Sequence, residues 1–396
     1  MNPFVYSILP RPPHPTRDGL AIRNYHLLQG LARRFRLRCF VLVAPHLDSE
    51  PGVYPEGAVV EIVPQPDRRL RAVAALAATA FSDRAYPELL YRSRSLSRRV
   101  RGAAAAEKPA WVIAHSYHVG PLALDAGLAA WVDFHNVESE IWQRMATASS
   151  TGAHRLFARW QAPRVRALEV SLLTRADGAS CVSDRDAALL SQLAAGAAPR
   201  VVPNGVDMDR YGFRPEPAEA ERVFFVGDLS WAPNAEGVRW FAREVWPIIR
   251  ERRPRAWVEV LGRRAPAELA EAGGPRFVFA GEGTDTRPHW RDAAVSIVPL
   301  TAGGGTRLKI LEAAACGVPV VSTRVGAEGL TFVDGEDILL ADDPPGFAEA
   351  VERLLADPGA RRRQAALARA RVEREYGWNA ISGRFADLLA EKTALS

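Results

Sequence analysis

The stretch GGGTRLKILE, residues 303–312, holds the closest grouping of residues that could bind a charged ligand. Its three glycines let the backbone approach a bound group without a Cβ in the way. Arg307 and Lys309 add two cations at the start of an expected helix, where the helix dipole disfavours positive charge unless an anion is bound. Glu312 lies about 9 Å along the helix axis from Thr306, at ~1.5 Å per residue, a reach suited to ribose hydroxyls. This spacing predicts a nucleotide phosphate on the loop, and the alternative is an ordinary βαβ unit with surface charges.

The elements that must position these residues follow from the apolar pattern around them. Val295–Leu300 is an apolar run typical of a strand buried on both faces. Apolar residues at helical spacing over Arg307–Cys316 predict a helix, with Thr306 as its N-cap and Gly317 beyond its end. Val318–Thr323 predicts the next strand. A glycine turn that leads into a helix at the carboxyl end of a parallel strand is a natural phosphate site.

Two histidines form a second group of candidates because each follows a predicted strand. His115 comes directly after Trp111–Ala114, and His135 comes directly after Trp131–Phe134. The carboxyl ends of parallel strands are where α/β proteins bind ligands, so either ring could contact a substrate. The alternative for each is a buried structural histidine.

The segment GGGTRLKILEAAACGVPVVST, residues 303–323, resembles the donor-site segment of family-4-type glycosyltransferases with the GT-B fold. It resembles in particular the subgroup that reads G-T-R-L-K-I-L-E-A. In that family two glutamates flank seven residues, and the second binds the nucleotide ribose. Glu312 matches the second glutamate, whereas Gly304 stands at the position of the first. The resemblance covers nearly the full chain and is most specific between residues 295 and 330.

The resemblance implies roles for individual residues. The implied donor-binding residues are Gly303, Gly304, Gly305, Thr306, Arg307, Lys309, Leu311, Glu312, Arg263 and Gly281. His135 is the first choice, and His115 the second, for the histidine that lies over the donor sugar in the family. Arg307 and Lys309 would stabilise negative charge on the leaving diphosphate.

On the acceptor side the resemblance implies Gly19 and Arg23, which match a glycine and an arginine at the family's first loop and helix. Gly19 could instead be only a turn residue. Asn136 and Glu138, which follow His135, could contact acceptor hydroxyls or cap the next helix.

The loop GDLSWAPNAEG, residues 227–237, departs from the family pattern. Many members carry an arginine and a lysine there that hold the donor diphosphate, whereas this loop has Asp228 and no cation. We therefore expect Arg307 and Lys309 to take over that role. Trp231 could line the sugar site, although we expect a buried tryptophan that packs the domain.

A length of 396 residues suits two domains. The resemblance implies an α/β protein of the GT-B fold, with two doubly wound Rossmann-like domains facing across a cleft. Residues 1–200 would bind the acceptor, residues 201–375 would bind the donor, and residues 376–396 would form a helix that crosses back to the first domain. The implied reaction moves a sugar from a nucleotide diphosphate sugar to an acceptor hydroxyl with retention, in surface polysaccharide or glycolipid biosynthesis, without a cofactor or a metal.

Two other functions stay open. A nucleotide-sugar epimerase of the same fold would need acid–base groups, which His115 and His135 could supply. A non-catalytic sugar-nucleotide binder would have lost its chemistry with the first glutamate of the family motif. A dinucleotide enzyme is disfavoured because the first turn is not GxGxxG. The sequence shows no carboxylate pair at helical spacing in the expected cleft, so a covalent double displacement is not supported.

The remaining chain alternates between strands and helices. Asp184-Arg185-Asp186 could bind a metal, but Ser183 is a natural N-cap and acidic residues suit a first helical turn. Ile141–Ala176 predicts a helix broken at Pro163. Further strands are predicted over Phe4–Leu9, Arg38–Ala44, Val59–Val63, Asp177–Ser183, Val223–Val226, Trp257–Leu261 and Phe277–Ala280.

The net charge is +5, and the basic excess is uneven. One cluster is Arg68, Arg69 and Arg71, and a second is Arg92, Arg94, Arg98, Arg99 and Arg101. Such clusters could hold an anionic membrane surface, or they could be solvated helix faces. Nucleic acid is disfavoured because no aromatic residues interleave with the arginines. The expected partners are a nucleotide-sugar donor and a glycan, glycolipid or small-molecule acceptor.

The remaining composition bears on where the protein works. Cys39, Cys181 and Cys316 are scattered, which favours a reducing compartment over disulfides or zinc. The N-terminal apolar run is too short and too rich in proline for a signal peptide. No window of the sequence holds the roughly 18 apolar residues of a membrane span. These features predict a cytoplasmic protein, at most peripheral on the inner face of the cell membrane.

Overall fold

The computed structural model divides the chain into two compact units, each with its own parallel sheet. Unit 1 is Met1–Pro203 with Asn379–Ser396, and unit 2 is Asn204–Trp378. Within the described residues, none of the helices is both long enough and apolar enough to span a bilayer. The described residues are 2–14, 18–44, 52–148, 152–214, 221–263, 268–269, 273–283, 285–302 and 306–394.

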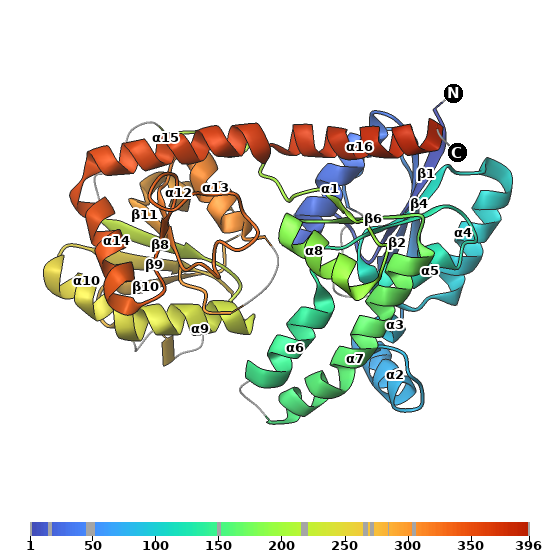
Figure 1. Ribbon diagram of the computed structural model, residues 1–396, viewed down its shortest axis with the longest axis horizontal. Coiled ribbons are helices and arrows are strands. Elements are labelled where there is room, and N and C mark those ends of the chain that lie inside the picture. Colours follow the sequence, from blue (N-terminus) through green and yellow to red (C-terminus); the bar gives the residue numbers. More distant parts are fainter. Residues whose placement is uncertain are drawn as a thin grey trace. The chain divides into compact units, whose positions relative to one another are not determined.

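Unit 1 is built on seven parallel strands in the order β3-β2-β1-β4-β5-β6-β7 (Figure 1). They are β1 (Phe4–Leu9), β2 (Arg36–Val43), β3 (Val59–Pro64), β4 (Trp111–Ala114), β5 (Ala130–Asp133), β6 (Gly178–Cys181) and β7 (Arg200–Val201). Every residue of β4 and β5 is buried, as expected for a parallel sheet covered on both faces. After β1, the chain adds β2 and β3 on one side of that strand. It then crosses the sheet and adds β4 on the other side of β1. Open parallel sheets bind ligands at such a switch point.

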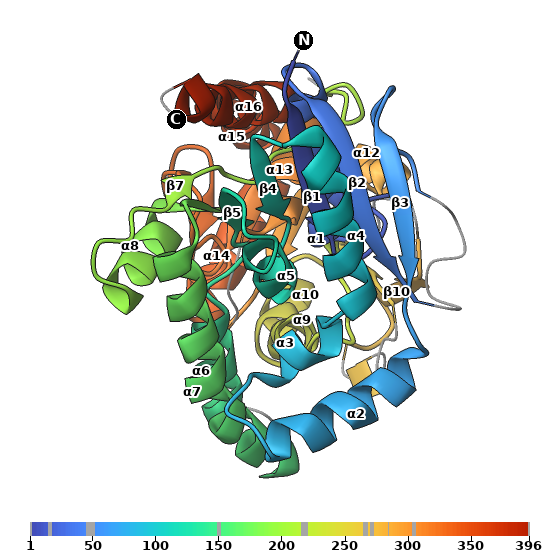
Figure 2. The same ribbon diagram turned by 90° about the vertical axis from the view of Figure 1, so that its right-hand side faces the viewer.

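Helices cover both faces of this sheet, with α1 and α16 on one face and α4 and α5 on the other (Figures 1 and 2). The helices are α1 (Gly19–Ala32), α2 (Arg68–Ala80), α3 (Tyr86–Tyr91), α4 (Arg94–Glu107), α5 (Gly120–Leu124), α6 (Glu138–Ala148), α7 (Gly152–Arg175), α8 (Asp184–Leu193) and nearly all of α16 (Trp378–Ala394). α16 packs on the sheet through Phe385, whose ring centroid lies 6.0 Å from that of Trp131. The end of the chain is therefore part of the first unit's core.

Unit 2 repeats the plan with six parallel strands in the order β10-β9-β8-β11-β12-β13. The strands are β8 (Arg222–Val226), β9 (Trp257–Leu261), β10 (Phe277–Gly281), β11 (Val295–Val298), β12 (Val320–Ser322) and β13 (Leu339–Leu340). The helices are α9 (Ala232–Trp240), α10 (Trp246–Arg252), α12 (Arg287–Asp292), α13 (Leu308–Cys316), α14 (Pro344–Ala356) and α15 (Pro358–Glu375), with a π-helical turn at Phe241–Val245 between α9 and α10. The switch point lies between β8 and β11.

Two local expectations are wrong, and one is confirmed. Pro163 lies inside α7 rather than ending a helix, because eight side chains buried along this 24-residue helix outweigh the one backbone hydrogen bond that proline removes. Thr306 is not the N-cap of α13, since the helix begins one residue later and Arg307 occupies the cap position without a capping side chain. Ser183 does cap α8, where its Oγ accepts a hydrogen bond from the backbone N–H of Asp186 at 3.1 Å.

Two glycines give a matched test of the packing of α16 on α1. A Cβ added to Gly30 would lie 2.4 Å from the backbone oxygen of Ser382, whereas a Cβ added to Gly383 would meet open space. We expect Gly30→Ala to lower the free energy of unfolding by about 1–3 kcal/mol, because the two helices must move apart. Gly383→Ala should raise it by about 0.5–1 kcal/mol, because alanine is the better helix former. Urea unfolding followed by circular dichroism measures both, and equal stabilities would contradict this packing.

Candidate functional site

The switch point of unit 2 brings together the first turns of two helices, α9 and α13. Gly227 directly follows β8, and a Cβ there would lie 2.8 Å from both Lys309 Nζ and Asn234 Nδ2. Only glycine leaves room for these two side chains at the carboxyl end of the strand. Helix N-termini present unpaired backbone N–H groups, so this corner suits an anion.

The Lys309 ammonium group lies in this corner against an amide and an aromatic ring. Its Nζ donates to Asn234 Oδ1 at 3.1 Å and lies 4.1 Å from the centroid of the Phe225 ring. Burial and the neighbouring charge of Arg307 lower the pKa of Lys309 to about 7, and Glu312 offsets part of this effect. The amine is therefore poised to gain a proton when an anion arrives.

Arg307 sits beside Lys309 with only 5% of its surface exposed. Its guanidinium carbon lies 5.8 Å from the centre of the Trp231 ring. Trp231 itself is 39% exposed, so the expectation of a buried tryptophan that packs the domain is wrong. The residue precedes α9 on the loop after β8, where its ring faces a cation rather than the core. An exposed indole beside a buried guanidinium offers a ligand a flat apolar surface next to positive charge.

Glu312 lies one turn beyond Lys309 on α13, on the same side of the helix. Burial raises the pKa of its carboxyl group, and the polar groups of Tyr211 and Trp290 beside it partly offset that rise. Tyr211 Oη also lies 3.3 Å from Thr286 Oγ1. The predicted ribose acceptor is thus held among polar side chains of unit 2.

The other residues predicted to bind the donor around α13 differ in their burial, and three of them are not described by the structure. Gly303, Gly304 and Gly305 lie outside the described residues. Thr306 Oγ1 is buried without a hydrogen-bond partner in the described part of the chain. The Leu311 side chain is wholly inside the core.

Arg263 and Gly281, also predicted to bind the donor, lie after β9 and at the end of β10. Arg263 forms an ion pair with Asp228, and its Nε lies 3.7 Å from Glu282. Gly281 has a φ of +80°, a conformation that favours glycine. Asp228 thus holds in place the arginine of a neighbouring loop.

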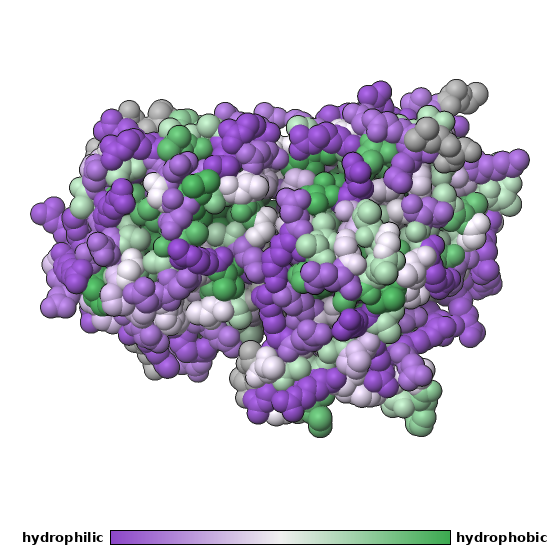
Figure 3. Space-filling view, viewed as in Figure 1, coloured by the Kyte–Doolittle hydropathy of each residue, from purple (hydrophilic) through white to green (hydrophobic). Residues whose placement is uncertain are grey.

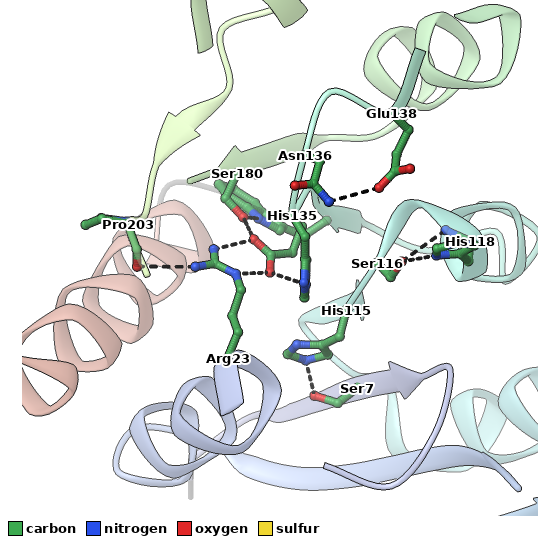
Figure 4. Close-up of polar contacts among 12 residues, drawn as sticks. Ser7, Arg23, His115, Ser116, His118, His135, Asn136, Glu138, Ser180 and Pro203 are labelled. Atoms are coloured by element: carbon green, nitrogen blue, oxygen red, sulfur yellow. Dashed lines mark hydrogen bonds and ion pairs between the residues drawn. The ribbon is translucent and has the colours of Figure 1, made fainter. Parts of the chain in front are cut away.

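At the switch point of unit 1, His115 packs against the first strand (Figure 4). Its Nε2 lies 3.1 Å from Ser7 Oγ, and the ring is fully buried. Burial lowers the pKa of His115 to about 4, so the ring is neutral at pH 7. With no exposed surface in this structure, His115 has the setting of a supporting residue.

His135 has the more open position of the two histidines. Its side chain is 14% exposed, and its Nε2 lies 3.2 Å from Asp133 Oδ2 (Figure 4). Asp133 itself is wholly buried and accepts two hydrogen bonds of 2.7 Å from Arg23, plus one of 2.6 Å from Ser180 Oγ. Burial works to raise the pKa of Asp133, but the Arg23 charge and hydrogen bonds hold it well below its usual range.

This network places the predicted acceptor residue Arg23 inside the protein. Its side chain is fully buried in the ion pair with Asp133, and its Nη1 donates to the Pro203 backbone oxygen at 3.2 Å. Gly19 is the first residue of α1, after Asp18, whose carboxylate caps the helix. Arg23 therefore ties α1 to the end of β5, and Gly19 stands at the open start of the same helix.

Asn136 and Glu138 lie at the start of α6. Asn136 Nδ2 donates to Glu138 Oε1 at 3.0 Å, while Glu169 of α7 accepts hydrogen bonds from the backbone N–H groups of Glu138 and Ser139. Burial raises the pKa of both Glu138 and Glu169 to about 7, and the Glu169 carboxylate also raises the pKa of Glu138. The Tyr117 side chain lies beside Glu138 in this cluster and partly offsets the rise in its pKa.

Several of these residues are absent from the sequence-based prediction. Asp133 carried a usable signal, because a charged residue inside the buried run WVDF requires a partner. Glu169 and Tyr211 carried none, since each meets its partner only through the fold.

Comparison with known proteins covers both units. A family model described as "Glycosyltransferase Family 4" matches residues 17–210, and one described as "Glycosyl transferases group 1" matches residues 220–357. D-inositol 3-phosphate glycosyltransferase 2 from Catenulispora acidiphila is 30% identical over 250 residues, which are 56% of this chain and 57% of that protein. The next curated relatives share about a quarter of their length with this chain.

Solved structures resemble the whole chain at low sequence identity. Sucrose-phosphate synthase from Thermosynechococcus elongatus has a TM-score of 0.76 at 17% identity and covers 99% of this chain and 100% of its own. The Anabaena protein HepE in complex with UDP-glucose has a TM-score of 0.67 at 15% identity, over 98% of this chain and 99% of its own. With both sheets, both family matches and this fold, the chain belongs to the group 1, family 4 glycosyltransferases of the GT-B fold.

Proposed function

We propose that this protein transfers a sugar from a nucleoside diphosphate sugar to an acceptor hydroxyl, with retention at the anomeric carbon. The observation that carries the proposal is the pair of cations, Arg307 and Lys309, at the switch point of unit 2. Two cations held together at a helix N-terminus favour the binding of an anion. A diphosphate is an anion of suitable size and charge.

The nucleoside part of the donor would continue along α13. Glu312, one turn from Lys309, would accept hydrogen bonds from the ribose hydroxyls, and Thr306 Oγ1 would donate to a phosphate oxygen. Trp231 would lie against the sugar or the diphosphate. UDP is the first nucleotide to try, because HepE, a distant structural neighbour, was solved with UDP-glucose.

Stabilisation of the negative charge on the leaving diphosphate would contribute most to catalysis. As the bond from the sugar to the diphosphate breaks, negative charge grows on the leaving phosphate, and Arg307 with protonated Lys309 would stabilise it without a metal. A retaining reaction without a covalent intermediate requires the acceptor to attack the face from which the diphosphate leaves. His135 in unit 1 would lie against the donor sugar, with Asp133 orienting its ring.

The acceptor would bind to unit 1 and carry several hydroxyls, as glycans, glycolipids and inositol phosphates do. The family relationship and the name of the Catenulispora relative support this class. Glu138 and Asn136, at the start of α6, are the candidate contacts for acceptor hydroxyls.

Glu312→Ala tests the donor site directly. Losing a carboxylate that accepts ribose hydrogen bonds should weaken donor binding about tenfold or more, or about 1.5–3 kcal/mol. Calorimetry with UDP-, GDP- and ADP-glucose on wild type and variant measures this change. Glu349→Ala, an exposed glutamate on α14, is the matched control and should bind as wild type does. Unchanged binding by Glu312→Ala would remove the proposed ribose contact.

The pH dependence of donor binding tests Lys309. In the free protein the pKa of Lys309 is about 7, and a bound diphosphate should raise it, so binding takes up a proton above that pH. Affinity should therefore be highest below about pH 7 and fall as the pH rises, by up to about tenfold per pH unit. UDP-glucose is the preferred probe because its diphosphate does not titrate in this range.

Lys309→Arg supplies the control for this pH effect, since arginine stays protonated. Its donor affinity should be nearly constant between about pH 6.5 and 8.5. Calorimetry in two buffers of different ionisation enthalpy should detect proton uptake for wild type and none for the variant. A wild-type affinity that does not change with pH would contradict the proposed contact.

His135→Ala separates catalysis from binding. If the ring acts on the reacting sugar, turnover should fall by about 10²-fold or more while the dissociation constant of the donor changes little. His154→Ala, an exposed histidine on α7, is the matched control. Radiolabelled sugar transfer gives the rate and calorimetry gives the affinity. An equal loss in both would assign His135 to binding instead.

A further inference from the structure

Helix α2 of unit 1 carries its apolar side chains on the outside. Only Ala75 and Thr79 of its 13 residues are buried. Leu70 is 68% exposed, Val73 is 69% exposed, and Phe81, directly after the helix, is 92% exposed. A surface helix of a globular protein normally turns such residues toward the core. The outward apolar face therefore requires another explanation.

Five of the exposed apolar residues form one continuous face. Leu70, Val73, Ala74, Ala77 and Phe81 follow one another at intervals of three and four residues, so they share one side of the helix. From Ala72 to Ser82 the sequence carries no charged residue. Figure 2 shows α2 at the edge of unit 1, away from the sheet, and Figure 3 shows pale green residues in the region of α2. We call the face made by these five residues the α2 face.

Positive charge lies at the start of the α2 face, where Arg68 and Arg69 are exposed. Beyond Phe81, Arg84 follows the exposed Asp83 and forms an ion pair with Glu88 at 3.3 Å. The segment 66–101 holds nine arginines and three acidic residues, a net charge of +6, whereas the whole chain carries +5. The basic excess of the protein is thus confined to the segment that contains α2.

We propose that the α2 face inserts into the interface of an anionic lipid bilayer, with Arg68 and Arg69 at its start on the lipid headgroups. An apolar helix face bordered by arginines matches the two layers of such a surface, hydrocarbon below and negative charge above. A second copy of this chain fits less well, because its arginines would repel these. The proposal stands on unit 1 alone and does not depend on the proposed sugar transfer.

Sedimentation of the full chain with vesicles tests the proposal. Wild type should pellet with vesicles of phosphatidylcholine mixed with phosphatidylglycerol and stay in solution with phosphatidylcholine alone. Val73→Asp should lower the partition coefficient about tenfold or more, because a charge would replace an apolar group that enters the bilayer. Leu367→Asp, at an apolar residue 51% exposed on α15 of unit 2, is the matched control and should bind as wild type does.

The charge contribution has its own matched pair. Arg68→Gln with Arg69→Gln should weaken binding about tenfold, since each arginine near an anionic surface contributes to it. Arg362→Gln with Arg363→Gln, on α15, removes the same charge from exposed positions in unit 2 and should have little effect. Thermal unfolding of each variant shows that the changed residues, all exposed, leave the fold intact.

A fluorescent label reports where the contact forms. Cys39, Cys181 and Cys316 are buried, so a thiol-reactive dye on Phe81→Cys or Leu367→Cys reacts with the introduced thiol. Anionic vesicles should shift the dye emission to the blue at position 81 and not at position 367.

Three results would overturn the proposal. One is a wild-type protein that stays in solution with anionic vesicles, and another is Val73→Asp binding as tightly as wild type. The third is a dimer of wild type, seen by sedimentation velocity, that Val73→Asp converts to monomer without any vesicle binding. In that case the α2 face joins two copies of the chain.

Discussion

Parallel strand pairing is the constraint on which both units depend. A parallel strand cannot be reached through a tight turn, so the chain crosses one face of the sheet before each new strand. Beside β1 and beside β8 successive crossovers go to opposite sides, which leaves the carboxyl ends of two neighbouring strands open. Candidate functional side chains lie at these strand ends. They are His115 in unit 1 and Lys309, beside Gly227, in unit 2.

The two units treat buried charge in opposite ways. In unit 1, Arg23 and Asp133 neutralise each other through two hydrogen bonds of 2.7 Å, and the matched pair fastens α1 to the sheet. In unit 2, Arg307 and Lys309 are like charges at the start of a helix, and burial lowers the pKa of the lysine to about 7. A matched pair contributes to the architecture, whereas like charges at a helix start favour the arrival of an anion. This difference separates a structural ion pair from a candidate phosphate site.

Helix α2 exposes its apolar side chains instead of burying them against the sheet. Its apolar residues face outward and its arginines lie in the first turn, which differs from the usual arrangement of a surface helix. Thr79 anchors the inner side through contacts with Arg84 and with Gln161 of α7. The helix is thus held by a few polar bonds while its apolar side stays available.

Local pattern was enough to place many elements of this chain. Short, mostly apolar runs set β1, β4 and β9 with the same bounds as the structure, because strands buried on both faces need them. The GTRLKILE segment and its glycine stop placed α13 to within one residue. The sequence could not show that His115 is fully buried while His135 is partly exposed, that Trp231 is exposed, or that Pro163 is accommodated within a helix. These outcomes depend on partners that are distant in the chain, such as Arg23 and Asp133, which lie 110 residues apart. Burial and ion pairing are properties of neighbours in space, and folding brings those neighbours together.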